Sequence, residues 1–123
     1  MSISDGTEAV VRSVMDLWKA AVDRHEPGEV AAQFTEDAIF QGLHPYSVGK
    51  PGVAAYYDSQ PPGMAAAYRI LEIREPAEGL VLGYLAVDFS FPDRPTVSVY
   101  LSVLLNHTEG GWRVSHYQVS RLD

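Results

Sequence analysis

The chain has 123 residues, of which 46% are hydrophobic and 20% are charged, so we expect one globular domain spanning residues 1–123. Its net charge of −7 makes nucleic acid and anionic membrane surfaces poor partners, and the lack of cysteine excludes disulfides, thiolate nucleophiles and zinc–thiolate sites. The first residues form no basic and apolar leader, and no apolar run is long enough to cross a membrane, which predicts a cytoplasmic protein.

Helices dominate the first half of the chain. Capping-box spacing between Asp5 and Glu8 indicates a helix over residues 5–24, which carries one apolar stripe: Val10, Val11, Val14, Leu17, Trp18, Ala21 and Val22. Pro27 suits the first turn of a short second helix that ends at Phe34. A brief strand over residues 38–41 and a loop over residues 42–50 precede a third helix over residues 51–59.

The second half is rich in Val, Ile, Leu, Tyr and Phe, which favours strands. Turn-like connectors divide it into four expected strands over residues 65–75, 81–91, 96–106 and 112–122. Short connectors favour antiparallel neighbours, and helices followed by a meander are typical of the α+β class.

Side-chain alternation predicts which residues share a face of this sheet. Pairing Phe91 with Thr96, and placing a three-residue turn at residues 109–111, brings the following residues to one face: Leu85, Val87, Phe89, Tyr100, Ser102, Trp112, Val114, His116, Gln118 and Ser120. This face begins apolar and becomes polar without charge, which is typical of the wall of a ligand cavity. A register slip of one residue would exchange the faces.

The opposite face collects Val97, Val99, Leu101, Val103 and Leu105 together with Tyr117 and Val119. It is too apolar to face water, so we expect a homodimer that buries this outer sheet face in an isologous contact. The alternative is that a helix covers this face and that the polar face is exposed to solvent.

Three segments carry a family resemblance: "AAQFTEDAIFQG", the helix after Gly49 and the closing "GWRVSHYQVS". With the long first helix they resemble the nuclear transport factor 2-like superfamily, in its SnoaL-like and ketosteroid-isomerase-like branch. The run "GLHPYSVGKPGVAAYYDSQPPG" is similar to small actinobacterial proteins associated with enediyne polyketide biosynthesis. The resemblance implies a cystatin-like cone, in which a curved, mainly antiparallel sheet wraps around three N-terminal helices and encloses an apolar pocket.

The resemblance also tests the steroid-isomerase chemistry. That reaction needs a tyrosine and two aspartic acids, and the matching positions look like Trp18, Gly42 and Ser102, or Val103 if the gap moves. None of these carries the required group. The ligand-facing positions of the closing strand match His116, Gln118 and Ser120.

The expected site therefore centres on His116, a candidate for proton transfer, with Tyr100 as a candidate second catalytic group. Ligand-binding candidates are Trp18, Phe40, His44, Tyr57, Val87, Phe89, Ser102, Gln118 and Ser120. Each has an ordinary alternative role in core or loop packing, and mutual hydrogen bonding would satisfy the polar ones. The histidine and carboxylate spacing predicts no metal site, and no cofactor motif is present.

Two functions of different classes follow from these residues. The first is a protein that binds a small, largely apolar molecule, such as one of polyketide or aromatic type, in an internal pocket. The second is a cofactor-free isomerase, cyclase or dehydratase in which His116 moves a proton while Tyr100 or Gln118 stabilises an oxyanion. A dimeric scaffold with a vestigial pocket is a third reading.

Overall fold

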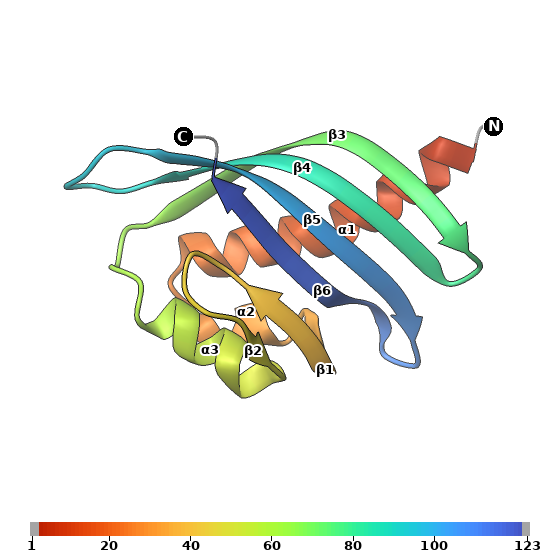
Figure 1. The fold of residues 1–123 in the computed structure, drawn as a ribbon, viewed down its shortest axis with the longest axis horizontal. Coiled ribbons are helices and arrows are strands. Elements are labelled where there is room, and N and C mark those ends of the chain that lie inside the picture. Colours follow the sequence, from red (N-terminus) through yellow and green to blue (C-terminus); the bar gives the residue numbers. More distant parts are fainter. Residues whose placement is uncertain (1–2, 122–123) are drawn as a thin grey trace.

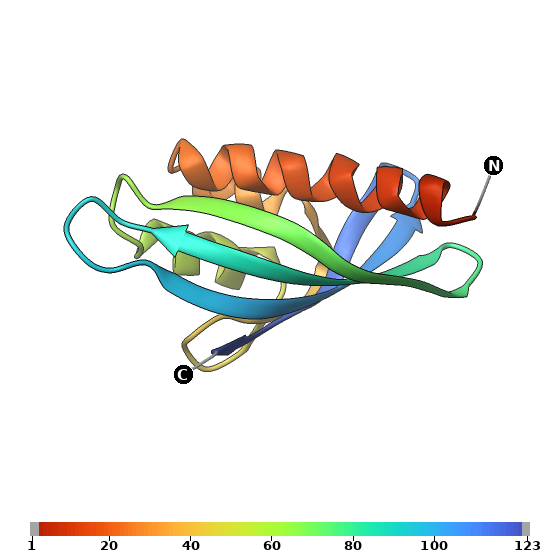
Figure 2. The same cartoon turned by 90° about the horizontal axis from the view of Figure 1, so that it is seen from above.

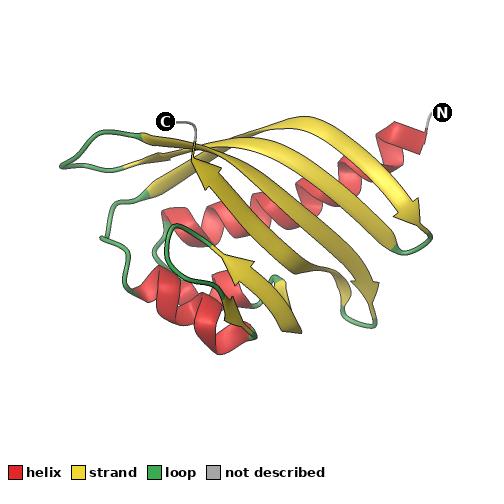
Figure 3. Cartoon of the chain, in the orientation of Figure 1, coloured by secondary structure: helices red, strands yellow, loops and turns green. Residues whose placement is uncertain are grey.

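The computed structural model describes residues 3–121, with side chains from Gly6 onward, so the expected capping partner Asp5 lies outside the described side chains. Three helices and six strands follow in the order α1 (Ile3–Asp23), α2 (Pro27–Ala31), β1 (Phe34–Gln41), β2 (Ser47–Val48), α3 (Lys50–Asp58), β3 (Ala65–Ala77), β4 (Leu80–Ser90), β5 (Val97–Thr108) and β6 (Gly111–Arg121) (Figures 1 and 3). One curved sheet holds all strands in the order β2-β1-β6-β5-β4-β3. Only β1 and β6 pair in parallel, so the α+β class is confirmed.

Helix α1 lies along one face of this sheet, which we call the inner face (Figure 2). Its apolar stripe is buried there, with exposed fractions of 3% or less for Val11, Val14, Met15, Trp18, Ala21 and Val22. Leu17 falls outside this stripe and is 57% exposed. Helix α3 adds the buried side chains of Val53 and Tyr57. None of the described helices combines the length and the apolar character needed to cross a membrane.

The pairing of β4 with β5 differs by one residue from the expected register. Phe89 pairs with Val97, and Val87 with Val99, where the sequence pattern predicts Ser98 and Tyr100 as partners. A one-residue slip turns every side chain of a strand to the other face. The inner face of β5 therefore carries Val97, Val99, Leu101, Val103 and Leu105.

This register corrects the expected dimer contact. Val99, Leu101, Val103 and Leu105 are fully buried, and Tyr117 is 1% exposed, all within the same hydrophobic core as α1 and α3. Val97 and Val119 are partly buried against that core. The helices of the same chain thus cover the apolar face, as in the alternative arrangement, and this face is not free for a partner.

A β-bulge at Ser115 sets the faces of β6. Leu105 pairs with Val114 but Leu104 pairs with His116, so Ser115 is an extra residue in its strand. Its hydroxyl donates to Asn106 Oδ1 at 2.7 Å and lies 3.2 Å from the Leu104 carbonyl oxygen. The turn is shorter than expected, because Thr108 already pairs with Gly111. Val114 and Tyr117 both reach the core as a result, and the expected single face from Trp112 to Ser120 is broken.

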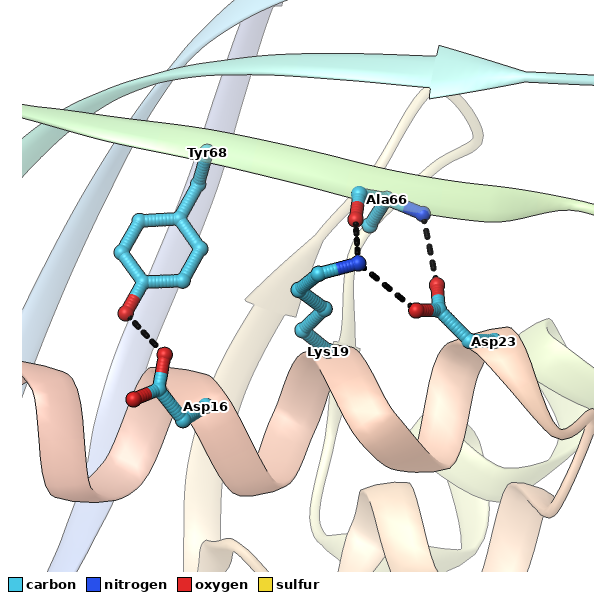
Figure 4. Close-up of polar contacts among 5 residues, drawn as sticks. All are labelled: Asp16, Lys19, Asp23, Ala66 and Tyr68. Carbon is cyan, nitrogen blue, oxygen red and sulfur yellow. Dashed lines mark hydrogen bonds and ion pairs between the residues drawn. The ribbon is translucent and has the colours of Figure 1, made fainter.

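Helix α1 also protects the edge of the sheet, since β3 has a neighbour on one side only. Asp23 accepts the Ala66 backbone N–H at 2.9 Å, and Lys19 Nζ donates to the Ala66 carbonyl at 2.7 Å and to Asp23 at 2.7 Å (Figure 4). The Tyr68 hydroxyl donates to Asp16 one turn earlier. At Ala66, side chains of α1 thus make the backbone hydrogen bonds that a further strand would otherwise make.

Replacing Asp23 tests this edge contact. Asp23→Ala leaves the Ala66 N–H without its acceptor and should lower the free energy of unfolding by about 1–2 kcal/mol. Asp23→Asn keeps an oxygen acceptor and should lose less. Chemical denaturation measures both, with Asp58→Ala on exposed α3 surface as the control, expected within about 0.5 kcal/mol of the parent. Equal stabilities for Asp23→Ala and the control would contradict the edge contact.

Tyr68 makes the stability sensitive to alkali. Burial, followed by the hydrogen bond to Asp16, raises the pKa of Tyr68 to about 12 from its ordinary 10.0. The folded state therefore retains a proton that the unfolded chain releases near pH 10, so this contribution is intact below pH 10 and disappears as pH rises through about 12. Tyrosinate absorbance, as the difference between the parent and Tyr68→Phe, should titrate near 12. A difference titrating at the ordinary pKa of tyrosine would refute this assignment.

Candidate functional site

An inner pocket opens between α3, the loop after β1 and the end of the β4–β5 hairpin. Its walls are Leu43, Tyr56, Tyr57, Gln60, Met64, Phe89, Phe91, Val97, Tyr117 and Val119. The space that the centre of a water molecule can reach is about 30 Å³, and the void between atoms is about 360 Å³ when the open mouth is included. Apolar and aromatic side chains dominate the walls, which is typical of sites for small organic molecules.

The polar part of this pocket is a pair of tyrosine hydroxyls. Tyr57 of α3 and Tyr117 of β6 place their Oη atoms 3.1 Å apart, and the indole Nε1–H of Trp18 donates to Tyr57 Oη at 3.2 Å. All three side chains are 3% exposed or less. Phe40 stacks on Tyr117 with ring centroids 4.6 Å apart, which fixes the orientation of that ring. We call Trp18, Tyr57 and Tyr117, whose indole N–H and two hydroxyls are joined by these hydrogen bonds, the hydroxyl triad.

A count of protons shows that the hydroxyl triad holds one donor in surplus. Its donors are one indole N–H and two phenolic O–H groups. Both hydroxyl oxygens have partners, but the two hydrogen bonds use only two of the three protons. Among the described residues, no other acceptor takes the third proton, whichever tyrosine carries it. The triad can therefore donate one further hydrogen bond into the pocket that both tyrosines line.

Burial keeps these hydroxyls protonated. It raises the pKa of Tyr57 and of Tyr117 well above the ordinary value of 10.0, because a buried phenolate would lose its hydration. Each tyrosine is thus a hydrogen-bond donor at neutral pH, not a base.

Tyr56, next to Tyr57 on α3, closes the pocket on a second side. Its hydroxyl accepts the backbone N–H of Leu43 at 3.3 Å, and burial raises its pKa. Its ring lies against Gly42, where a Cβ atom would stand 2.6 Å from the ring. Beyond Tyr56 lies a shallow outer groove, in which the centre of a water molecule can reach about 330 Å³. It is lined by Phe40, His44, Pro45, Ser47, Gly52, Ala55, Tyr56 and Ser59.

The structure separates the candidate residues into an inner and an outer group. Tyr57 and Phe89 line the inner pocket, Trp18 belongs to the hydroxyl triad, and Val87 is buried core beneath it. Phe40 and His44 line the outer groove, where the His44 ring stands 5.6 Å from that of Tyr56. These six candidates lie around one end of the sheet.

The remaining candidates, including both catalytic ones, lie on the outer face of the sheet. Ser102 pairs with Gln118, Tyr100 with Ser120, and Leu104 with His116. These residues of β5 alternate with its buried residues, so they and their partners face the other side of the sheet. The expectation that Tyr100, Ser102, His116, Gln118 and Ser120 line the internal pocket is therefore wrong. The cause is the slipped β4–β5 register, which turns the even-numbered residues of β5 outward, and the bulge at Ser115, which does the same to the even-numbered residues that follow it in β6.

Two residues of the site are not among the predicted ligand-binding residues. The sequence pattern places Tyr117 in the expected dimer contact, and it predicts Tyr57 but not Tyr56 as a ligand contact. The available signal was the apolar face of β5: the most apolar face of a sheet packs on the helices, and Tyr117 pairs with Val103 on that face. Within the described part of the chain, no three His, Asp or Glu side chains come together as a metal site would require.

The outer face carries a row that is uncharged across five strands and ends at Arg74 of β3, the partner of Leu82. Neighbouring partners in this row, which we call the outer stripe, are Val48, Ile39, His116, Leu104 and Leu82. Val48 is 60% exposed, Ile39 44% and Leu82 37%. Tyr84 and Tyr100 lie beside it with ring centroids 5.5 Å apart.

Comparison with known proteins relates this chain to others by structure. No protein-family model and no curated protein sequence matches it. A ketosteroid isomerase-like protein from Erwinia carotovora atroseptica superposes with a TM-score of 0.80 at 22% identity, over 94% of this chain and 95% of the other. A Nostoc punctiforme domain of unknown function with a cystatin-like fold superposes with a TM-score of 0.81 at 18% identity, over 98% of this chain and 79% of the other. An NTF-2 like protein of unknown function from Shewanella oneidensis superposes with a TM-score of 0.79 at 13% identity, over 92% of this chain and 98% of the other. The chain therefore has the cystatin-like fold of NTF2-like and ketosteroid isomerase-like proteins.

Proposed function

We propose that the protein binds a small, largely apolar molecule in the inner pocket, and that this molecule presents a hydrogen-bond acceptor to the hydroxyl triad. The surplus proton of Tyr57 and Tyr117 carries the proposal, because a buried donor is stabilised by an acceptor. The aromatic walls favour a flat, ring-containing ligand. Together with the resemblance to enediyne-associated proteins, this favours an aromatic or polyketide-derived ketone or quinone.

Binding is favoured over proton-transfer catalysis by the chemistry of the walls. The described residues that line the inner pocket include no carboxylate and no imidazole, and the tyrosines there stay protonated. His116 is on the opposite face of the sheet, so it has no route to a ligand held by the triad. An isomerase or dehydratase reaction would need a proton acceptor that these walls lack.

A matched pair of probes tests the proposal. The ketone 1-indanone and the hydrocarbon indane share one ring system, but only the ketone accepts a hydrogen bond. In the parent protein both should bind, and the double variant Tyr57→Phe/Tyr117→Phe should lower the affinity for the ketone relative to the hydrocarbon by about five- to tenfold, the worth of one hydrogen bond. Calorimetric titration measures the four dissociation constants.

The control is the double variant Tyr84→Phe/Tyr100→Phe, which removes the same two groups from the outer face. It should leave the ratio of the two affinities unchanged. Failure of both probes to bind the parent would reject the pocket as a ligand site. Binding that outer-face variants weaken as much as triad variants would reject the triad as its polar contact.

We further propose that the protein forms a homodimer through the outer stripe, since the apolar face of β5 is covered by the helices of the same chain. The sheet is about 24 Å wide at the usual strand spacing, so two facing sheets can each bury on the order of 800 Å², as a stable interface requires. The stripe contains no carboxylate, lysine or arginine although the chain has a net charge of −7. Two copies can therefore approach there with little charge repulsion.

Charge substitution in the outer stripe tests the dimer. Ile39→Lys/Leu82→Lys places two charges in the proposed contact and should raise the dimer dissociation constant more than a hundredfold, by about 3 kcal/mol or more. Sedimentation equilibrium measures this change. Leu17→Lys, on the exposed side of α1, is the control and should behave as the parent. A monomeric parent, or a dimer indifferent to both charges, would contradict the proposal.

A further inference from the structure

Among the described residues, Tyr56 alone lines both the inner pocket and the outer groove. Each hollow taken alone holds only part of a two-ring molecule. The inner pocket offers about 30 Å³ to the centre of a water molecule and about 360 Å³ of void when its open mouth is included, so a single bound ring extends into the mouth. The outer groove offers about 330 Å³ but is shallow and open. Joined, the two fall within the usual range for small-molecule sites, roughly 300–1,000 Å³.

The contacts that hold Tyr56 in place are few and can be broken separately. One hydrogen bond, from the Leu43 N–H at 3.3 Å, ties its hydroxyl to the loop after β1. Its ring makes edge contacts with Phe40 at 5.0 Å, Tyr57 at 5.1 Å and His44 at 5.6 Å. Leu43 and His44 are exposed, so the outer side of the ring is covered only by a surface loop. Tyr57 by contrast is 3% exposed and is tied to both Trp18 and Tyr117.

The outer groove is lined from two elements. His44 and Pro45 line it from the loop after β1, and Gly52 and Ala55 line it from α3. An imidazole and a proline ring both pack favourably against an aromatic plane. No carboxylate, lysine or arginine lines this groove, so it does not select for charge.

We propose that the two hollows form one ligand site and that Tyr56 is the movable partition between them. The ligand is then a two-part molecule: an acceptor-bearing ring meets the hydroxyl triad, and a second planar ring occupies the outer groove against His44. This inference rests on the proposed function and adds the length and shape of the ligand. Tyr56 becomes the residue that decides how long a ligand the site accepts.

The test compares 1-indanone with 5-phenyl-1-indanone, which has the same ketone and one additional ring. Tyr56→Ala removes the partition and should raise the affinity for the longer probe relative to the shorter about tenfold, because the aromatic contacts of Tyr56 no longer have to be broken. Association of the longer probe should also become faster. Tyr56→Phe keeps the ring but loses the Leu43 hydrogen bond, so it should speed association and change the affinity ratio less.

His44→Ala keeps the test decisive if Tyr56→Ala proves unstable, since His44 is exposed and its removal spares the core. It should weaken the longer probe about threefold or more, the worth of one aromatic contact, and leave 1-indanone unchanged. The inference is overturned if Tyr56→Ala and His44→Ala affect the two probes equally. That result would leave the shorter probe bound through the triad, so the proposed function would stand. If neither probe binds the parent, both proposals fail.

Discussion

One extra residue in the last strand decides which side chains this protein turns inward. The bulge at Ser115 lets Val114 and Tyr117 both face the helices, although their sequence separation would put them on opposite faces of a regular strand. Without it, either Tyr117 or Val114 would face outward. The hydrogen bond from Ser115 to Asn106 and the pairing of Leu104 with His116 hold the bulge in place. The inner pocket and the outer stripe both depend on this local irregularity.

The inner end of the sheet combines core packing with a polar group. Phe34, Phe40, Tyr57 and Tyr117 pack ring against ring, and this aromatic cluster makes up much of the core near α3. Two hydroxyls and an indole are buried among these rings, and one phenolic proton has no acceptor among the described residues. Buried polar groups cost free energy unless they are fully paired. A pair of tyrosines with one proton to spare is thus a feature that packing does not require, and a ligand contact gives it a role.

The sequence predicts the elements of this fold better than it predicts their faces. The apolar stripe around Val14 and Trp18, and the strand-forming runs divided by turns, correctly indicate α1 and the four long strands, and the family resemblance implies the right architecture. Pairing within the sheet depends on turns and bulges, and these leave weak traces in one sequence. A turn between β4 and β5 that begins one residue earlier than expected, after Ser90, and one unpaired serine in β6 were enough to exchange the two faces.

Part of the site could nevertheless be predicted, because some residues do not depend on strand register. Trp18 lies on a helix whose apolar stripe fixes its direction, Tyr57 lies on the expected third helix, and both belong to the triad. His116, Gln118 and Tyr100 depend on register alone and lie on the other face. A simple comparison of the two faces would have corrected this, since a face made of Val99, Leu101 and Val103 is more fit for contact with helices than one containing Ser102 and Gln118.

The central claim is that the ligand site belongs to the inner face, with Tyr57 and Tyr117 at its polar end. Nuclear Overhauser contacts between bound 1-indanone and the protein test it most directly. The account predicts contacts from the indanone protons to the rings of Tyr57, Tyr117 and Phe89, and none to His116 or Tyr100. Contacts to His116 and Tyr100, with none to the triad, would contradict it.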